Sequence, residues 1–245
     1  MEERIWIGTS GWHYKHWRGP FYPESMPDRE LLDFYAERLR TVEINNSFYH
    51  LPSRKSVNNW RESTPKGFLF AVKSSRYITH LKRLKDPKQG IQKFFSRALT
   101  LDSKLGPVLF QLPPNWKSDV PRLRNFLEAL PKGQRYAFEF RDPSWFNAET
   151  YKVLERYGGA LCVSDLAGEE SPKVLTGKFA YLRLHGPAKQ KYSGRYTRAQ
   201  LRRWLDYCRR WLKKGAKEVF IYFDNDQAGF AALNALELQT MVRRR

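Results

Sequence analysis

The sequence predicts a single (β/α)8 barrel of the TIM type, which is an α/β fold. The chain has 245 residues, and barrels of this type typically have about 250. Eight short apolar runs recur along it, and amphipathic helical patterns fill most of the intervals between them. This alternation predicts a parallel sheet, for which an open doubly wound arrangement is the alternative. No linker or internal repeat divides the chain, so we expect one domain over residues 1–245.

The predicted strands are near-continuous apolar runs, which are typical of parallel strands covered on both faces. In chain order they span residues 4–9, 41–46, 69–74, 106–112, 135–141, 160–165, 179–185 and 218–224. Because successive side chains of a strand point to opposite faces, residues two apart in each run are expected to share a face.

Helical patterns follow most of these strands. They span residues 28–40, 53–63, 87–103, 119–130, 147–157, 197–214 and 227–241. Asp28, Ser53 and Asn147 are predicted N-caps, because their side-chain oxygens can accept hydrogen bonds from the first turn of a helix. The interval 166–178 is too short and too interrupted by glycine and proline for a full helix. The sixth helical connection is therefore predicted to be degenerate.

The composition excludes several classes of protein. With 41% hydrophobic and 15% aromatic residues, the chain has too much apolar surface for a disordered protein. It has no apolar run of about 20 residues, so no membrane span or membrane partner is expected. The start, MEERIWIGTSGW, lacks the features of a signal peptide. Cys162 and Cys208 are too few for a disulfide framework and are expected to be buried thiols, which favours a cytoplasmic protein.

The positive charge of the chain is concentrated in two segments. The formal net charge is +19, and residues 61–120 and 181–245 carry nearly all of the surplus. A basic domain with this imbalance is typical of proteins that bind DNA or RNA. A surface rich in ion pairs is the alternative, but ion pairing explains a high charge content better than an excess of one sign.

Polar side chains lie at the C-terminal ends of seven predicted strands. They are Glu43, Asn45, Ser47, Lys73, Ser75, Gln111, Glu139, Arg141, Asp165, Arg183, His185, Tyr222, Asp224 and Asp226. In a barrel these strand ends meet at the mouth, where the active sites of this fold are found. One such residue is usually a loop anchor, whereas seven strands that share the pattern indicate a ligand or catalytic pocket.

We assign roles within this region by side-chain chemistry. The catalytic candidates are Glu43, Lys73, Glu139, Asp165, His185 and Asp224. The candidates for binding substrate are Trp12, Tyr14, Asn45, Gln111, Arg141, Arg183, Tyr192, Tyr222 and Asn225. Arg141 and Arg183 would clamp a phosphate or carboxylate, and His185 or Glu139 would move protons. Alternatively, His185 is structural and Lys73 forms an ion pair with Glu43 or Glu139.

Two loops that would rim the mouth are basic and aromatic. The loop after the third strand contains Arg76, Tyr77, His80, Lys82, Arg83, Lys85 and Lys88. The loop after the seventh strand contains Lys189, Lys191, Tyr192, Arg195, Tyr196 and Arg198. Cations neutralise phosphates and aromatic faces stack on bases, so these loops favour a nucleic-acid partner. The alternative is that the aromatic side chains fill a lid while the charges are solvated.

Six motifs resemble those of the YecE-like family, also called domain of unknown function 72. They are IGTSGWHYKHWRGPFYP (7–23), VEINNSFY (42–49), FQLPP (110–114), EFRDPSW (139–145), YLRLHG (181–186) and YFDND (222–226). The resemblance covers almost the whole chain and implies a TIM-like barrel without implying an activity. The architecture is broadly similar to endonuclease IV and to sugar-phosphate isomerases, which is an analogy of fold alone.

The side chains at the predicted mouth bear on three chemistries. A three-zinc site needs several histidines, and only His185 of the five lies at a strand end, although one Mg²⁺ or Mn²⁺ ion on the carboxylates stays open. A glycosidase pair on the fourth and seventh strands fails, since Gln111 and His185 lie there, but Glu139 with Asp165 or Glu43 is not excluded. A Schiff base on Lys73 also stays open.

Three hypotheses of function follow. The favoured one is a nucleic-acid-processing enzyme, a hydrolase of a phosphodiester or glycosidic bond, because the charge lies on the predicted rim. The second is a small-molecule enzyme that acts on a sugar phosphate or another anion. The third is a barrel that binds nucleic acid without catalysis, in which mouth variants would bind as well as the wild type.

Overall fold

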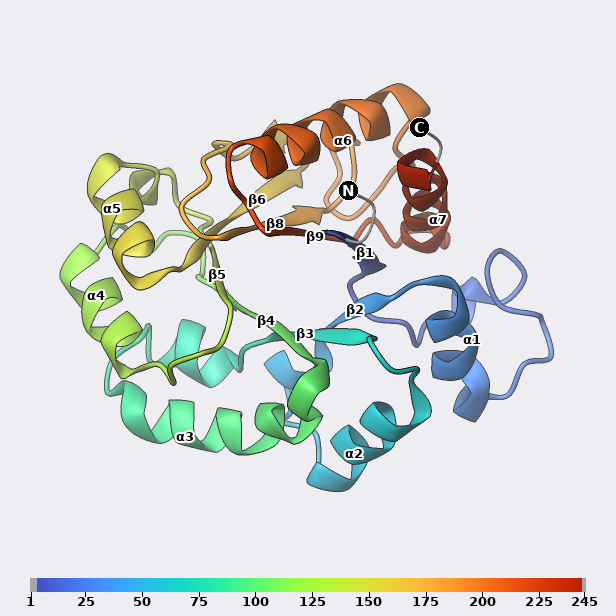
Figure 1. Ribbon diagram of the computed structural model, residues 1–245, viewed down its shortest axis with the longest axis horizontal. Helices are drawn as coiled ribbons and strands as arrows, with labels where there is room; N and C mark the ends of the chain where they lie inside the picture. Colours follow the sequence, from blue (N-terminus) through green and yellow to red (C-terminus); the bar gives the residue numbers. More distant parts are fainter. Residues whose placement is uncertain (1–3, 244–245) are drawn as a thin grey trace.

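A computed structural model describes residues 4–243, which form a nearly closed parallel barrel surrounded by helices (Figure 1). The strands are β1 (Ile5–Thr9), β2 (Thr41–Ile44), β3 (Leu69–Lys73), β4 (Leu105–Gln111), β5 (Tyr136–Glu139), β6 (Ala160–Leu166), β7 (Glu169–Glu170), β8 (Phe179–Leu184) and β9 (Glu218–Phe223). The sheet order is β1-β9-β8-β6-β5-β4-β3-β2. A bridge between Ser10 and Glu43 links its two ends. The eight predicted strands are confirmed, and the alternative of an open sheet is wrong.

In the described part of the chain, seven α-helices cover the outside of the barrel (Figure 1). They are α1 (Leu31–Arg38), α2 (Arg54–Ser63), α3 (Pro87–Ala98), α4 (Val120–Ala129), α5 (Ala148–Tyr157), α6 (Arg198–Lys213) and α7 (Phe230–Arg243). Ser53 and Asn147 cap α2 and α5 as predicted, by accepting hydrogen bonds from backbone N–H groups. Asp28 instead begins a short 3-10 turn, Asp28–Glu30, that precedes α1.

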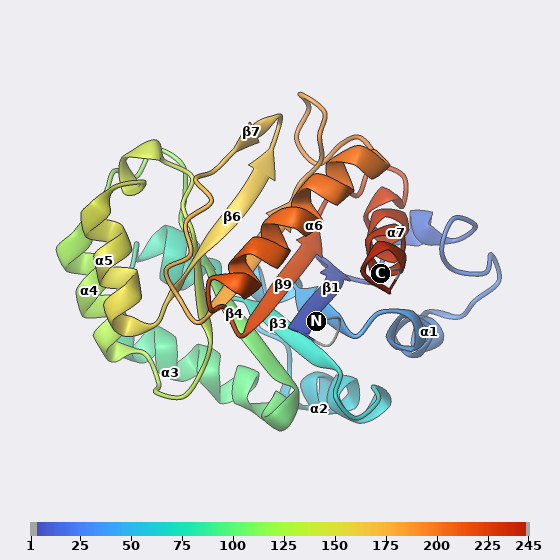
Figure 2. The ribbon, with the colours of Figure 1, turned by 45° about the horizontal axis from the view of Figure 1, so that its top comes forward.

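The connection between β6 and β8 contains no helix, as predicted. The short strand β7 pairs antiparallel with the end of β6 and lies beyond it (Figure 2). The Thr176 hydroxyl then accepts a hydrogen bond from the Leu161 N–H and donates one to the Gly159 carbonyl. These bonds tie the extended segment to the barrel where a helix would otherwise pack.

The barrel interior is a packed core below its polar mouth. Alternate side chains of the strands fill it: Leu69, Ala71, Leu109, Ala137, Ala160, Cys162, Phe179, Tyr181, Phe220 and Tyr222. The other faces of the strands pack against the helices in a second, larger core. Cys162 and Cys208 are both buried and unbridged, as expected. Among residues 4–243, no helix is long and apolar enough to cross a membrane.

Gly8 allows β1 and β2 to approach closely at the seam of the barrel. A Cβ atom at this position would lie 2.1 Å from the Thr41 carbonyl oxygen, which is backbone and cannot rotate away. We expect Gly8→Ala to destabilise the protein by about 1–3 kcal/mol, the usual cost of overpacking, as measured by urea unfolding. Gly159→Ala, at a position without a positive φ where an added Cβ would first meet the rotatable end of the Leu154 side chain at 3.1 Å, is the comparison for lost backbone freedom. Equal unfolding midpoints for the two variants would contradict the close approach.

Candidate active site

A buried arginine holds three carboxylates together at the barrel mouth. Arg183 on β8 is 1% exposed, and its Nε and Nη2 donate to Glu43 Oε1 at 3.1 and 2.9 Å. Its Nη1 donates to Glu139 Oε2 at 2.9 Å, and its Nη2 also donates to Asp224 Oδ2 at 3.0 Å. The partners come from the ends of β2, β5 and β9. The side chains that were predicted to face the barrel interior at the C-terminal ends of these strands therefore do lie together.

Glu43 is saturated by its neighbours. Besides Arg183, its Oε1 accepts a hydrogen bond from Ser10 Oγ at 2.6 Å, and its Oε2 accepts one from the Tyr181 hydroxyl at 2.6 Å. The side chain is fully buried. Because both oxygens have donors and neither faces solvent, Glu43 acts as the anchor of Arg183 rather than as an accessible base.

Glu139 and Asp224 are held in the ionised form. Burial alone would raise the pKa of Glu139, but the Arg141 and Arg183 guanidiniums hold that pKa well below its usual range. Arg141 Nη2 lies 2.5 Å from Glu139 Oε1. Burial also acts to raise the pKa of Asp224, and Arg183 together with the His185 hydrogen bond lowers it. Neither carboxyl is therefore a proton donor near neutral pH.

His185 and Asp224 form a pair suited to proton transfer. His185 Nδ1 lies 2.9 Å from Asp224 Oδ2, while its Nε2 lies 3.1 Å from Arg141 Nη2 and 3.3 Å from Glu139 Oε1. A carboxylate that accepts from Nδ1 fixes the tautomer and leaves Nε2 as the reactive nitrogen. The Tyr192 ring covers the imidazole edge-on, with 5.4 Å between ring centroids. Access to Nε2 therefore depends on Tyr192 and Arg141.

Lys73 at the end of β3 has no carboxylate partner. Within residues 4–243 it takes part in no ion pair, because Arg183 and Arg141 engage the carboxylates around it. Its ammonium lies 4.4 Å from the centroid of the Phe48 ring. Burial, with the Arg183 charge, lowers the pKa of Lys73 to about 8. The ion pair considered from the sequence is therefore wrong, and a fraction of this amine is neutral at physiological pH.

The loop after β1 forms one wall of the mouth. The Tyr14 hydroxyl donates to the Ser10 carbonyl at 2.6 Å, and burial together with Asp224 raises the pKa of this phenol. Asp226 accepts a hydrogen bond from Trp17 Nε1 at 2.5 Å and pairs with His16 at 3.0 Å. Burial raises the pKa of Asp226 to about 6. Unlike Glu139 and Asp224, this carboxyl can carry a proton near neutral pH.

Several other candidates lie elsewhere at the mouth. Trp12 packs edge-on against Trp60, with 5.3 Å between ring centroids. Asn45 and Gln111 are half-buried, and within residues 4–243 the Asn45 Oδ1 has no hydrogen-bond partner. They lie at the ends of β2 and β4, so both can contact a ligand at the mouth.

Three residues that the sequence placed in the site have other positions. Asp165 lies next to interior-facing Ser164 and therefore points outward, where it accepts a hydrogen bond from the Tyr196 hydroxyl at 3.0 Å. Tyr222 faces inward but lies deep in the barrel, bonded to Thr41 at 2.8 Å. The Asn225 amide donates to the Gly194 carbonyl and to Asn234, so it anchors the loop after β8. None of the three can contact a substrate here.

The role expected for Arg183 also needs correction. Its donors already engage Glu43, Glu139 and Asp224, and it is buried, so it cannot clamp an anionic ligand. Arg141 is 11% exposed at the mouth and remains the candidate for that role.

The divalent ion that the sequence left open does not fit this arrangement. The carboxylate oxygens that would bind it face the Arg183 guanidinium, and a second cation there would be repelled. Among residues 4–243, no cluster of three or more His, Cys, Asp or Glu side chains is placed to hold a metal ion.

The sequence also missed three members of the site. Tyr181 and Ser10 bind Glu43, and Phe48 lies under Lys73. Tyr181 could have been found, since it precedes Arg183 by two residues and so shares its face. Ser10 follows β1 and Phe48 lies in a short turn, and neither position carries a periodic signal.

The rim of the mouth carries exposed aromatic and cationic side chains. Of the five large apolar side chains that are exposed within residues 4–243, four lie in the loops after β2, β3 and β8: Tyr49, Tyr77, Leu81 and Tyr192. Five exposed cations of these loops form no ion pair in that part of the chain: Arg76, Arg83, Lys85, Lys189 and Lys191. Tyr77 and Tyr192 are exposed although Tyr192 also contacts His185, whereas Tyr196 of the β8 loop and Trp17 of the β1 loop are buried.

The sequence matches a known protein family over nearly its whole length. The model of the family "Protein of unknown function DUF72" matches residues 6–245. The chain belongs to this family. This DUF72 protein is 29% identical to the UPF0759 protein YunF of Bacillus subtilis. The alignment has 275 positions and covers 97% of this chain and 94% of YunF. It is 30% identical to YecE of Escherichia coli K12 over 154 residues, which cover 62% of this chain and 54% of YecE.

Solved structures agree with the barrel. A DUF72 family protein of Thermotoga maritima superposes with a TM-score of 0.88 at 30% identity, covering 98% of this chain and 99% of that one. A D-psicose 3-epimerase of Clostridium cellulolyticum, solved with D-tagatose, gives a TM-score of 0.60 at 11% identity, covering 97% of each chain. At that identity the second likeness establishes the fold alone.

Proposed function

We propose that this DUF72 protein is a nucleic-acid-processing enzyme. Its rim would bind the phosphate backbone, and its mouth would act on a phosphodiester or glycosidic bond by acid–base catalysis. The supporting observation is the position of the unpaired cations and exposed tyrosines, which surround a mouth that holds His185, Asp224 and Lys73. Cations neutralise phosphates, and tyrosine faces stack on bases whatever the sequence.

The mouth groups would divide the chemistry among them. Arg141 would move partly away from Glu139 and bind a phosphate oxygen. This movement would expose His185 Nε2. With Nδ1 held by Asp224, Nε2 would take the proton of the attacking water. Asp226, whose pKa is raised to about 6, is a proton donor for the leaving oxygen. General acid–base catalysis of this kind typically contributes about 10²–10⁴-fold in rate.

The salt dependence of binding tests the rim. We expect a fluorescent single-stranded oligonucleotide to bind more weakly as salt increases, with a straight line in a plot of log affinity against log salt. Lys189→Gln with Lys191→Gln should lower the slope of that line by about 1.4, since each phosphate contact on a single strand contributes about 0.7.

A matched control removes two charges from the other end of the barrel. Lys213 and Lys214 are exposed at the end of α6, which runs from the mouth side back to the start of β9. Lys213→Gln with Lys214→Gln should leave both the affinity and the slope unchanged. Equal losses in the two double variants would indicate nonspecific attraction and would contradict a binding rim.

A small-molecule enzyme is the second candidate, favoured by Lys73. A neutral lysine amine can attack an aldehyde or ketone of a sugar or sugar phosphate, which forms an imine and releases water. This reading is compatible with a barrel fold shared with sugar epimerases.

Borohydride trapping tests the reactivity of Lys73. Borohydride reduces an imine to a stable secondary amine, so incubation with dihydroxyacetone phosphate or an abasic-site oligonucleotide should add mass at Lys73. The yield should increase as pH rises through about 8, because deprotonation supplies the neutral amine, and then level off. Lys73→Met should abolish the adduct, whereas a yield that is independent of pH, or an adduct on surface lysines, would contradict this role.

A further inference from the structure

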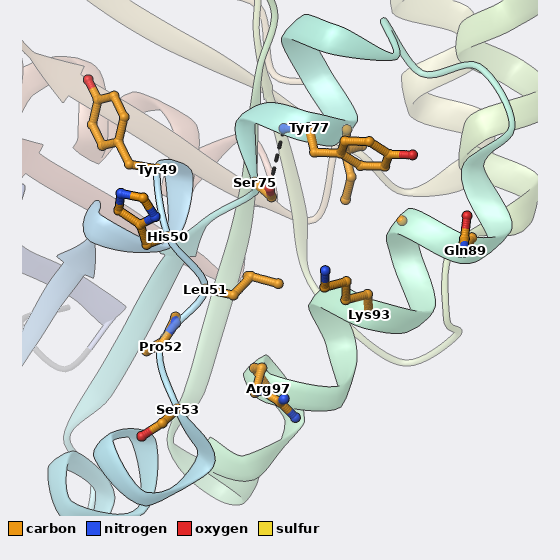
Figure 3. Close-up of a pocket in the computed structure, with 12 residues that line it drawn as sticks. Tyr49, His50, Leu51, Pro52, Ser53, Ser75, Tyr77, Gln89, Lys93 and Arg97 are labelled. Atoms are coloured by element: carbon orange, nitrogen blue, oxygen red, sulfur yellow. Dashed lines mark hydrogen bonds between the residues drawn. The ribbon is translucent and has the colours of Figure 1, made fainter.

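A pocket of about 680 Å³ lies beside the mouth, between the segment after β2 and helix α3 (Figure 3). Its lining residues are Tyr49, His50, Leu51, Pro52, Ser53, Ser75, Tyr77, Ile78, Gln89, Gly90, Lys93 and Arg97. Pockets that bind small ligands typically have about 300–1,000 Å³. None of the residues described above as the acid–base machinery lines it.

The pocket has an uncompensated positive charge. Lys93 and Arg97 lie one turn apart on the same side of α3, and Figure 3 shows both facing the space between α3 and the opposite segment. None of the lining residues is acidic, and neither cation forms an ion pair within residues 4–243. An anionic group can therefore bind here without displacing an internal partner.

An aromatic face lies above these cations. Tyr77 is 42% exposed, and its ring projects toward α3 (Figure 3). A Cβ at Gly90 would lie 3.1 Å from Ile78 and 3.6 Å from the Tyr77 ring. Glycine inside a helix costs about 1 kcal/mol relative to alanine, and here it leaves room for that ring. Tyr77 also begins a π-helical turn, Tyr77–Leu81, a feature that is frequent at functional sites.

The pocket borders the mouth through shared residues. Ser75 lines the pocket and follows Lys73 by two residues. Phe48 lies between the two regions, with its ring 4.4 Å from the Lys73 ammonium and 5.0 Å from the ring of Tyr49, which lines the pocket. A chain that enters the mouth could thus continue into the pocket.

We propose that this pocket binds one nucleotide, with the base stacked on Tyr77 and the phosphate held by Lys93 and Arg97. The inference rests on the proposed function, because the pocket would hold the nucleotide that is adjacent, along the bound strand, to the nucleotide in the mouth. The same chemistry would also bind a free mononucleotide, so both sources are compared in the test.

Calorimetric titration with adenosine 5′-monophosphate and with inorganic phosphate tests the pocket. We expect Lys93→Gln with Arg97→Gln to weaken mononucleotide binding at least tenfold. Lys93→Gln alone should weaken mononucleotide binding less. Because Lys93 is exposed, this single variant is expected to fold and therefore controls for misfolding of the double variant. Tyr77→Ala should weaken mononucleotide binding but not phosphate binding. The control at Lys213 and Lys214 should bind the mononucleotide as the wild type does.

Titration of a 12-nucleotide single strand separates this inference from the function. If the strand binds but the pocket variants change neither its affinity nor that of the mononucleotide, the pocket inference is overturned and the function stands. If no strand binds and the mononucleotide still depends on Lys93 and Tyr77, the pocket is a free-nucleotide site and the proposed function fails. No mononucleotide binding by the wild type overturns the inference.

Discussion

Replacing Arg183 by methionine is expected to destabilise the protein by about 3–5 kcal/mol, the usual result of removing one member of a buried ionic cluster. The change leaves Glu43, Glu139 and Asp224 facing one another at the mouth without the guanidinium that they share. Methionine fills a similar volume, so the loss would come from uncompensated charge rather than from a cavity. The free energy of unfolding in urea measures it.

A second substitution separates charge from packing. Adding Glu43→Gln to Arg183→Met should recover part of the lost stability, since one of the unpaired charges is then removed. Arg209→Met is the surface control. Arg209 pairs with Asp206 at 3.4 Å on the exposed face of α6, and surface ion pairs of this kind contribute about 0–1 kcal/mol to stability. An Arg183→Met protein as stable as this control would show that the cluster does not hold the mouth together.

Asp224→Asn is expected to reduce turnover by about 10²–10⁴-fold while nucleic-acid binding is retained. The asparagine keeps the shape of the side chain, but it no longer fixes the Nδ1–H tautomer of His185 or stabilises the imidazolium. Initial rates and oligonucleotide affinity are measured on the same preparation. Asp206→Asn, on the exposed face of α6, is the control for a lost carboxylate.

The pH profile distinguishes catalysis from a structural role for Asp224. A loss of stability alone would reduce the rate by the same factor at every pH at which the protein stays folded. Loss of the proton relay instead changes the shape of the profile, because His185 has lost the carboxylate that holds its Nδ1–H. An Asp224→Asn variant with full activity would exclude this pair from the chemistry.

The barrel could be predicted from the sequence because its strands are covered on both faces. The run FIYF in β9, for example, is apolar at every position, and so is VLF in β4. Such runs mark a buried parallel strand without any alignment. The degenerate connection 166–178 was equally readable, since its glycines and proline prevent a helix.

The site was only partly predictable. The alternation of side chains along a strand predicts which face of the sheet a residue lies on, but not how deep in the barrel it lies. It placed Tyr222 and Asp224 together, yet Tyr222 lies one layer lower and binds Thr41. It could not show that Arg183 of β8 reaches Glu43 of β2 across the barrel, which depends on closure. Asp165 was assigned to the site because it lies at a strand end, but its place in the alternation of β6 puts its side chain on the outward face.

Incubation of the protein with labelled substrates tests the central claim most directly. Single-stranded, double-stranded and abasic DNA and RNA are each incubated with wild type and with Asp224→Asn, in Mg²⁺ or in EDTA. We expect wild type to process at least one substrate and Asp224→Asn to bind that substrate with little or no product. Processing of no substrate by the wild type, or equal product from the two proteins, would contradict a nucleic-acid-processing mouth.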